Sequence, residues 1–173
     1  MKTIVITGAE CSGKTTLAEQ LAGHYKTNFC QEYARTFLEN LNRKYTYTDI
    51  ENLAKEQEAI QASVPNKGNN ISILDTDLLT LKIWMHDKFH QYPRWFDKAL
   101  KVHFEARMYI LCSPEIPYKV DPLREDEFRR FEIFKIYKSE LKKLNANYFV
   151  VEGSKTERLE QCISLIKNHS STG

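Results

Sequence analysis

The amino-acid sequence predicts an α/β fold in which a parallel sheet is covered by helices on both faces. Five short segments are almost continuously apolar, which is typical of strands buried on both sides of a parallel sheet. Segments of helical character alternate with these strands, the order that builds such a sheet. The chain has 173 residues, of which 42% are hydrophobic and 28% charged, the size and composition of one globular domain.

The expected strands are rich in β-branched and aromatic residues, which favour extended backbone. In chain order they read "KTIVIT" (2–7), "TNFCQ" (27–31), "ISILDTD" (71–77), "ARMYILC" (106–112) and "NYFVVE" (147–152). A glycine-rich loop follows the first strand. Two further loops are predicted at "VPNKGNN" (64–70) and at the proline-punctuated "SPEIPYKVDP" (113–122).

Helices are expected between the strands. A capping box, in which a Ser or Thr side chain and an acid three residues later satisfy the first backbone N–H groups, is predicted at Thr48 with Glu51 and at Ser154 with Glu157. The predicted helices span about 14–24, 32–42, 48–63, a region 78–104 broken near Pro93, 124–144, and a last helix after Ser154. We expect one domain over residues 1–168 and a frayed tail at 169–173.

Composition excludes several classes of function. A net charge of +2 is too small to indicate nucleic-acid binding, and no apolar run approaches the length of a membrane span or forms a signal peptide. The four cysteines stand far apart without a CxxC pair, which argues against a disulfide framework and for a reduced, cytoplasmic setting. We therefore expect a small-molecule partner, with neither nucleic acid nor a membrane.

The first loop carries the pattern G-x-x-x-x-G-K-[ST], with Gly8, Gly13, Lys14 and Thr15. Such a loop brings backbone N–H groups close to phosphate oxygens, and the positive end of the following helix adds to the attraction. Lys14 would reach the β- and γ-phosphates and the Thr15 hydroxyl would bind Mg²⁺. The residues expected to bind ATP are Gly8, Ala9, Glu10, Cys11, Ser12, Gly13, Lys14, Thr15 and Thr16.

Acidic residues follow the second and third strands, at the edge where parallel sheets bind ligands. Asp75 is expected to hold Mg²⁺ or to take a proton from an attacking hydroxyl. Asp77 would bind substrate or, alternatively, cap the next helix. In "EYAR", Glu32 and Arg35 share one helical face and are expected to meet the substrate together with Tyr33, although Glu also simply favours helix N-termini.

A lid is predicted at about 115–131, where a proline-bounded loop runs into a charged helix. Its arginines would stabilise the migrating phosphoryl group, with Arg124 as a catalytic residue and Arg129 or Arg130 on ATP. A solvated helix face is the alternative reading of these charges. Aromatic residues crowd the span after the third strand, where most should be core and Trp84 and Trp95 are candidates for stacking on a flat substrate ring.

Taken together, "GAECSGKTTLAEQLA", "EYAR", "DTDLLT" and "VDPLR" resemble the ribosylnicotinamide kinase family, the kinase domain of the NAD-salvage protein NadR and its stand-alone relatives. The resemblance implies a P-loop NTPase kinase fold with strand order 2-3-1-4-5. It also implies ATP- and Mg²⁺-dependent phosphorylation of nicotinamide riboside on its 5′ hydroxyl. Pro122 departs from the family, in which a more flexible residue is frequent at this place of the lid.

Two other readings remain open. Phosphate loops do not encode the acceptor, so a kinase for another nucleoside or small metabolite is the second reading. A non-catalytic nucleotide sensor is the third. Nucleoside monophosphate kinases usually carry an arginine directly after the third-strand aspartate, and Thr76 at that place favours an uncharged acceptor.

Overall fold

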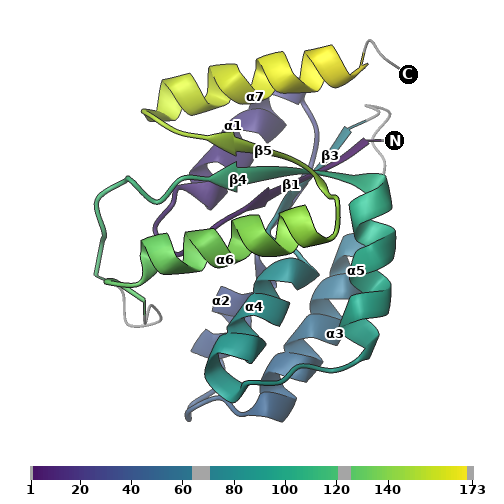
Figure 1. Cartoon of the computed structure of the whole chain (residues 1–173), viewed down its shortest axis with the longest axis vertical. Helices are drawn as coiled ribbons and strands as arrows, with labels where there is room; N and C mark the ends of the chain where they lie inside the picture. The colour runs from purple at the N-terminus through teal and green to yellow at the C-terminus, as the bar shows by residue number, and fades with distance from the viewer. Residues whose placement is uncertain (1, 64–70, 121–125, 171–173) are drawn as a thin grey trace.

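A computed structural model describes residues 2–63, 71–120 and 126–170 of the chain and shows one parallel sheet with helices on both faces (Figure 1). The sheet has five strands in the order β2-β3-β1-β4-β5. Its strands are β1 (Lys2–Thr7), β2 (Phe29–Cys30), β3 (Ile71–Asp75), β4 (Arg107–Cys112) and β5 (Asn147–Val151). This confirms the expected fold class and strand order, and β2 is shorter than the segment that the sequence predicts.

The strands alternate their side chains between two apolar layers, as the two-residue period of a strand requires. In β1, Val5 faces one hydrophobic cluster, whereas Ile4 and Ile6 face the other. In β4, Tyr109 and Leu111 likewise lie in the first cluster. Both faces of the central strands are thus buried, which explains why they read as continuous apolar runs.

The helices divide between these layers. Helices α1 (Lys14–Tyr25) and α7 (Lys155–Ser170) pack on one face of the sheet. The other face is covered by α3 (Tyr47–Ser63), α4 (Leu78–Phe89), α5 (Trp95–Ala106) and α6 (Arg130–Lys143), with the short α2 (Tyr33–Glu39) beside them. Among the described residues, no helix is both long and apolar enough to cross a membrane.

The predicted capping boxes have different outcomes. The box at Ser154 and Glu157 is present, because the Ser154 N–H donates to Glu157 Oε2 at 2.7 Å and the Glu157 N–H to Ser154 Oγ at 3.3 Å. The box predicted at Thr48 and Glu51 is wrong, because both residues already lie within α3. Thr46 and Asp49 form it instead, with the Thr46 N–H donating to Asp49 Oδ2 at 2.7 Å.

Two other boundaries differ from the sequence prediction. Helix α6 begins at Arg130 rather than near residue 124, and residues 121–125 of the predicted lid lie outside the described part of the chain. Helix α7 continues through His169 into the expected tail, where the His169 ring packs against Phe149 with centroids 4.9 Å apart.

The register of the strands determines which residues meet at the carboxyl edge of the sheet. Asp75, the last residue of β3, lies opposite Ile6 of β1, and Thr7 of β1 lies opposite Leu111 of β4. The chain turns into the phosphate loop directly after Thr7. The ends of three neighbouring strands therefore meet at this loop, as is typical of ligand sites in open α/β sheets.

Candidate functional site

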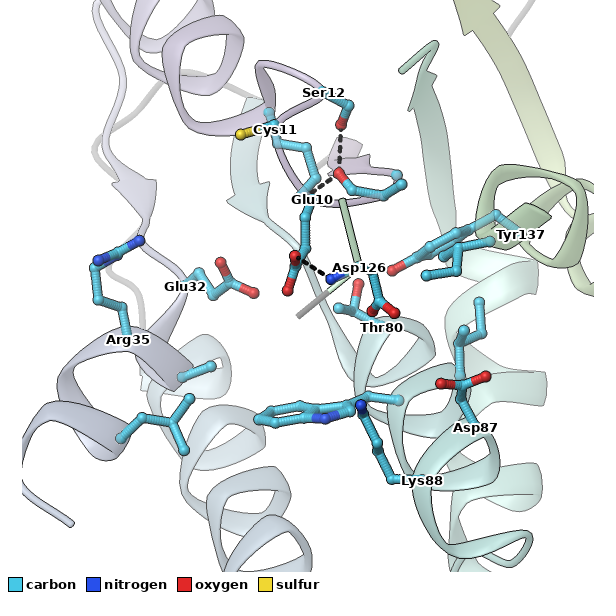
Figure 2. A pocket seen from close by; sticks show the side chains of 18 of the residues that line it. Glu10, Cys11, Ser12, Glu32, Arg35, Thr80, Asp87, Lys88, Asp126 and Tyr137 are labelled. Atoms are coloured by element: carbon cyan, nitrogen blue, oxygen red, sulfur yellow. Dashed lines mark hydrogen bonds between the residues drawn. The ribbon is translucent and has the colours of Figure 1, made fainter. Parts of the chain in front are cut away.

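A cavity of about 820 Å³ lies at this edge of the sheet (Figure 2). The phosphate loop, Gly8 to Thr16, forms one wall. Glu32, which precedes α2, and residues of α2, α4 and α6 complete the lining, with Trp84 and Tyr137 among them. The cavity is large enough for a nucleotide and part of a second small molecule.

The glycines of the loop are required by its backbone. Gly8 has φ +140°, and a Cβ there would lie 2.8 Å from the carbonyl oxygen of Cys112. Gly13 has φ +81°, and a Cβ there would lie 2.9 Å from Cδ1 of Ile116. Any other residue at either position would have to move a neighbour and accept a strained conformation. The loop is thereby kept tight at the start of α1.

Lys14 is held within the loop that it serves. Its Nζ donates a hydrogen bond of 2.9 Å to the carbonyl oxygen of Ala9, and the Ser12 hydroxyl donates to the same oxygen at 2.7 Å. Lys14 is also the first residue of α1, whose first turn adds unpaired N–H groups and the positive end of the helix dipole to the same loop. This combination attracts phosphate.

Thr15 and Asp75 are in direct contact. The Thr15 hydroxyl donates to Asp75 Oδ2 at 2.6 Å, and Asp75 is only 1% exposed. Burial of the carboxyl group and the nearby negative charge of Glu32 raise the pKa of Asp75 to about 6. The hydrogen bond from Thr15 and the positive charge of Lys14 lower it, but by less. The structure therefore joins the hydroxyl and the carboxylate that the sequence assigns to Mg²⁺.

These two groups fit a magnesium ion. Within the described residues, Asp75 Oδ1 is buried without a hydrogen-bond partner. A carboxylate oxygen of this kind beside a hydroxyl is a hard-oxygen donor set, the type that Mg²⁺ prefers, with water and phosphate oxygens completing its shell. Asp75 itself is not part of the cavity lining and lies behind Thr15, which is.

Glu32 precedes α2 and points its carboxylate into the cavity (Figure 2). It is the N-cap residue of α2, which agrees with the preference of Glu for helix N-termini, but its side chain makes no capping hydrogen bond to the helix. Arg35, one turn later, also lines the cavity and lies 3.7 Å from Glu39. Tyr33 is not part of the lining, and its backbone N–H donates to Gln57 Oε1 at 2.8 Å.

The two tryptophans lie in different places. Trp84 lines the cavity, where its Nε1 donates to the Tyr45 hydroxyl at 3.1 Å and the two rings lie edge to face with centroids 5.0 Å apart. Trp95 does not line the cavity and packs instead on Phe96, with centroids 4.5 Å apart. Trp84 therefore remains a candidate for stacking on a substrate ring, whereas Trp95 packs against the hydrophobic core.

Asp77 lies away from the cavity and is 1% exposed. It caps α4 by accepting from the Leu79 N–H at 3.1 Å. Its other oxygen accepts from the Tyr109 hydroxyl at 2.7 Å and from Arg107 at 3.0 Å. The geometry therefore favours the helix cap that the sequence left open over substrate binding, because both carboxylate oxygens are committed inside the fold.

Of the predicted lid arginines that the structure describes, Arg129 and Arg130, neither lines the cavity. Arg129 forms a two-point ion pair with Asp87, at 2.6 and 3.0 Å. Arg130 donates to the carbonyl oxygens of Ile116 at 2.8 Å and of Cys11 at 3.4 Å. Arg124 lies outside the described residues. In this conformation Arg130 contacts backbone carbonyls at and near the phosphate loop, whereas Arg129 is paired with carboxylates of α4 and α6.

Sequence reasoning missed several lining residues. Thr80, Asp87 and Lys88 lie on the same face of α4 as Trp84, and a helical projection could have grouped them. Tyr137 approaches from the side opposite Glu32 (Figure 2). Burial raises the pKa of its phenol, so it remains a neutral hydrogen-bonding group. No local pattern marks Tyr137, because α6 meets the site only through the fold.

Comparisons with known proteins agree with this geometry. The family described as AAA domain matches residues 3–158. No curated protein matches the chain. A crystal structure of NadR protein in complex with NR matches with a TM-score of 0.73 and 21% identity, and a second, with NAD and AMP-PNP, with 0.72 and 19%. A deoxyadenosine kinase from M. mycoides, with bound products dCMP and dCDP, matches with 0.63 and 14%.

The extent of these matches differs. The alignments cover 99% of this chain for both NadR structures but only 52% and 50% of the NadR chains, so this chain spans about half their length. For the deoxyadenosine kinase the coverage is 96% of this chain and 99% of the other. At these identities the comparisons establish the shared fold.

Proposed function

Since the chain belongs to the AAA domain family, which matches residues 3–158, we propose that it is an ATP-dependent kinase for a small nucleoside-type acceptor, with nicotinamide riboside as the first candidate. The observation that carries this proposal is that one cavity is lined both by the phosphate loop and by Glu32, Trp84 and Tyr137. A donor triphosphate and an acceptor hydroxyl could meet in it.

The transfer needs little covalent chemistry from the protein. The acceptor oxygen forms a bond to the γ-phosphorus while the bond from that phosphorus to the β–γ bridging oxygen breaks, and ADP leaves. Lys14 and the loop N–H groups balance the charge of the β- and γ-phosphates. A Mg²⁺ ion held through Thr15 and Asp75 would supply further charge neutralisation.

Glu32 is the better candidate for the base. Its carboxylate points into the cavity, where it can take the proton from the acceptor hydroxyl (Figure 2). Asp75 is buried, does not line the cavity and accepts the Thr15 hydroxyl. We therefore assign Asp75 to the metal and Glu32 to the hydroxyl, a choice that the sequence alone leaves open.

The acceptor assignment rests on Trp84 and on the structural neighbours. The cationic pyridinium ring of nicotinamide riboside would gain from an aromatic face and from the nearby carboxylate of Glu32. The resemblance of the motifs and the NadR structure in complex with NR support this acceptor. The second candidate is another nucleoside, which the similarity to the M. mycoides deoxyadenosine kinase favours.

The test is a panel assay. ADP formation from MgATP should be measured with nicotinamide riboside, its acid form, deoxyadenosine, uridine and cytidine, and each product identified by mass. We expect nicotinamide mononucleotide as the main product. Glu32→Gln should lower kcat by roughly 10²–10⁴ and leave nucleotide binding intact. Preference for another nucleoside would select the second candidate. Tight ATP binding without turnover on any acceptor would instead indicate a non-catalytic nucleotide sensor.

A further inference from the structure

Arg158 is a buried arginine that ties three loops together behind the phosphate loop. It lies near the start of α7 and is only 2% exposed. Its Nη1 donates to the carbonyl oxygen of Ser12 at 2.7 Å. Its Nε donates to the carbonyl oxygen of Gly153 at 2.8 Å, and its Nη2 to that of Ser113 at 3.0 Å. These carbonyls follow β1, β5 and β4, three neighbouring strands of the sheet.

Glu115 completes the arrangement. It accepts from Arg158 Nη2 at 2.9 Å and also from the Gly153 N–H. That backbone bond, together with Arg158, holds the pKa of Glu115 below its usual value. The desolvation of a guanidinium group is costly, and an apolar side chain would fill such a space at lower cost. Stability alone therefore does not explain this arginine; its donors hold three backbone carbonyl groups in place.

The bond to Ser12 fixes the direction of the next amide. The peptide bond between Ser12 and Gly13 is trans, so its C=O and N–H groups point in opposite directions. Because the carbonyl points at Arg158, the N–H of Gly13 points away from Arg158. Gly13 lines the cavity and Arg158 does not. A Cβ on Gly13 would lie 3.9 Å from Arg158 Nη1, so the guanidinium lies close behind this residue.

We propose that Arg158 is a positioning residue for the nucleotide: by holding the Ser12 carbonyl from behind, it aims the Gly13 N–H at a phosphate oxygen of the bound triphosphate. Arg130 makes a weaker contact of the same kind, at 3.4 Å to the Cys11 carbonyl. The inference rests on the proposed nucleotide site, but its measurement is binding rather than turnover.

The matched control is Lys82. This buried cation, whose side chain is 7% exposed, pairs with Glu140 at 2.8 Å and Asp97 at 3.1 Å. It does not line the cavity. Replacing either Lys82 or Arg158 by Met removes a buried charge and leaves acidic partners behind, so both variants should lose stability. Only the Arg158 variant should change the phosphate loop.

The experiment measures the Kd of AMP-PNP with Mg²⁺ by calorimetry, and the melting temperature, for the parent, Arg158→Met and Lys82→Met. We expect Arg158→Met to weaken AMP-PNP binding roughly tenfold or more, the loss of one well-aimed charge-assisted hydrogen bond. Lys82→Met should melt earlier but bind within twofold of the parent. In turnover assays the KM for ATP should rise in Arg158→Met, with the acceptor KM unchanged.

Arg158→Lys serves if the Met variant does not fold, since it keeps the charge but cannot span the three carbonyls. Its Gly13 amide resonance should respond less to AMP-PNP than that of the parent. Parent-like affinity and parent-like Gly13 shifts in a variant that melts earlier would overturn the positioning role. A parent that binds AMP-PNP but phosphorylates no acceptor would overturn the kinase proposal alone, and a parent that binds no nucleotide would overturn both.

Discussion

The hydroxyl of Thr15 and the carboxylate of Asp75 are joined by a hydrogen bond of 2.6 Å, although sixty positions separate them in the chain. The parallel pairing of β1 with β3 produces this contact, because Asp75 at the end of β3 lies opposite Ile6, one residue before the end of β1. The phosphate loop and the acid at the end of β3 thus form one unit, and the predictions that follow test its parts.

Lys14→Ala should abolish phosphoryl transfer in a protein that still folds. The loss of a positive charge from the transition state should cost several kcal/mol, on the order of a thousandfold in rate. The matched control is Lys98→Ala, which removes an exposed lysine of α5 outside the cavity. Turnover of both purified variants should be compared with the parent, and near-parent turnover by Lys14→Ala would exclude a kinase role for this loop.

Asp75→Asn should lose activity far more than Asp77→Asn, whereas Asp77→Asn should lose more stability. Among the described residues nothing donates to the buried Asp75 Oδ1, which is open to Mg²⁺, while Asp77 accepts from Tyr109 and Arg107 and caps α4. Weakening that network should lower the free energy of unfolding by about 1–3 kcal/mol. Turnover against Mg²⁺ concentration and urea unfolding measure the two effects. The reverse pattern would exchange the roles of the two acids.

The pH dependence of stability should report Asp75. Its pKa rises from an ordinary value of 3.8 to about 6 on folding, so the folded protein binds this proton more tightly. Stability from this group is therefore full below about pH 4 and is lost as the pH rises through 6, by about 3 kcal/mol.

Asp75→Asn removes the titration of Asp75 and leaves those of the other carboxylates unchanged. Comparing this variant with the parent therefore isolates the contribution of Asp75. The difference in unfolding free energy, Asp75→Asn minus parent, should grow in favour of the variant between pH 4 and 6 and stay constant above pH 7. Measurements without Mg²⁺ are required, because a bound cation favours the ionised carboxylate. A difference that is flat across this range would refute the raised pKa.

Trp84→Leu should reduce the preference for a cationic acceptor, and Trp95→Leu should not. Trp84 lines the cavity, and an aromatic face stabilises a cation by about 0.5–2 kcal/mol, depending on burial. Trp95 packs on Phe96 outside the cavity and serves as the matched control. The ratio of kcat/KM for nicotinamide riboside to that for uridine measures the preference. Equal ratios in the parent and in Trp84→Leu would refute stacking at Trp84.

Local patterns in the sequence determined the parts of the site that depend on adjacent residues. The phosphate loop is such a part, because the positive φ angles of Gly8 and Gly13 are local requirements of its backbone, although Cys112 and Ile116 also exclude a Cβ there. The apolar runs of the sheet and the capping box at Ser154 are predictable for the same reason. The box at Thr48 was mispredicted because two overlapping Thr and acid pairs satisfy the same spacing, and only Thr46 with Asp49 has the right geometry.

Only the tertiary structure decided which of several equal candidates contact the site. Asp75 and Asp77 look alike in sequence, but strand pairing brings Asp75 to Thr15, while the start of α4 turns Asp77 toward Tyr109. Likewise, Trp84 lies on the face of α4 that lines the cavity, whereas Trp95 of α5 packs outside it. Arg158 and Tyr137 carry no local signal, because their partners come from distant strands and loops. Local patterns limit the backbone conformation of a segment, but side chains meet across the sheet only through long-range packing.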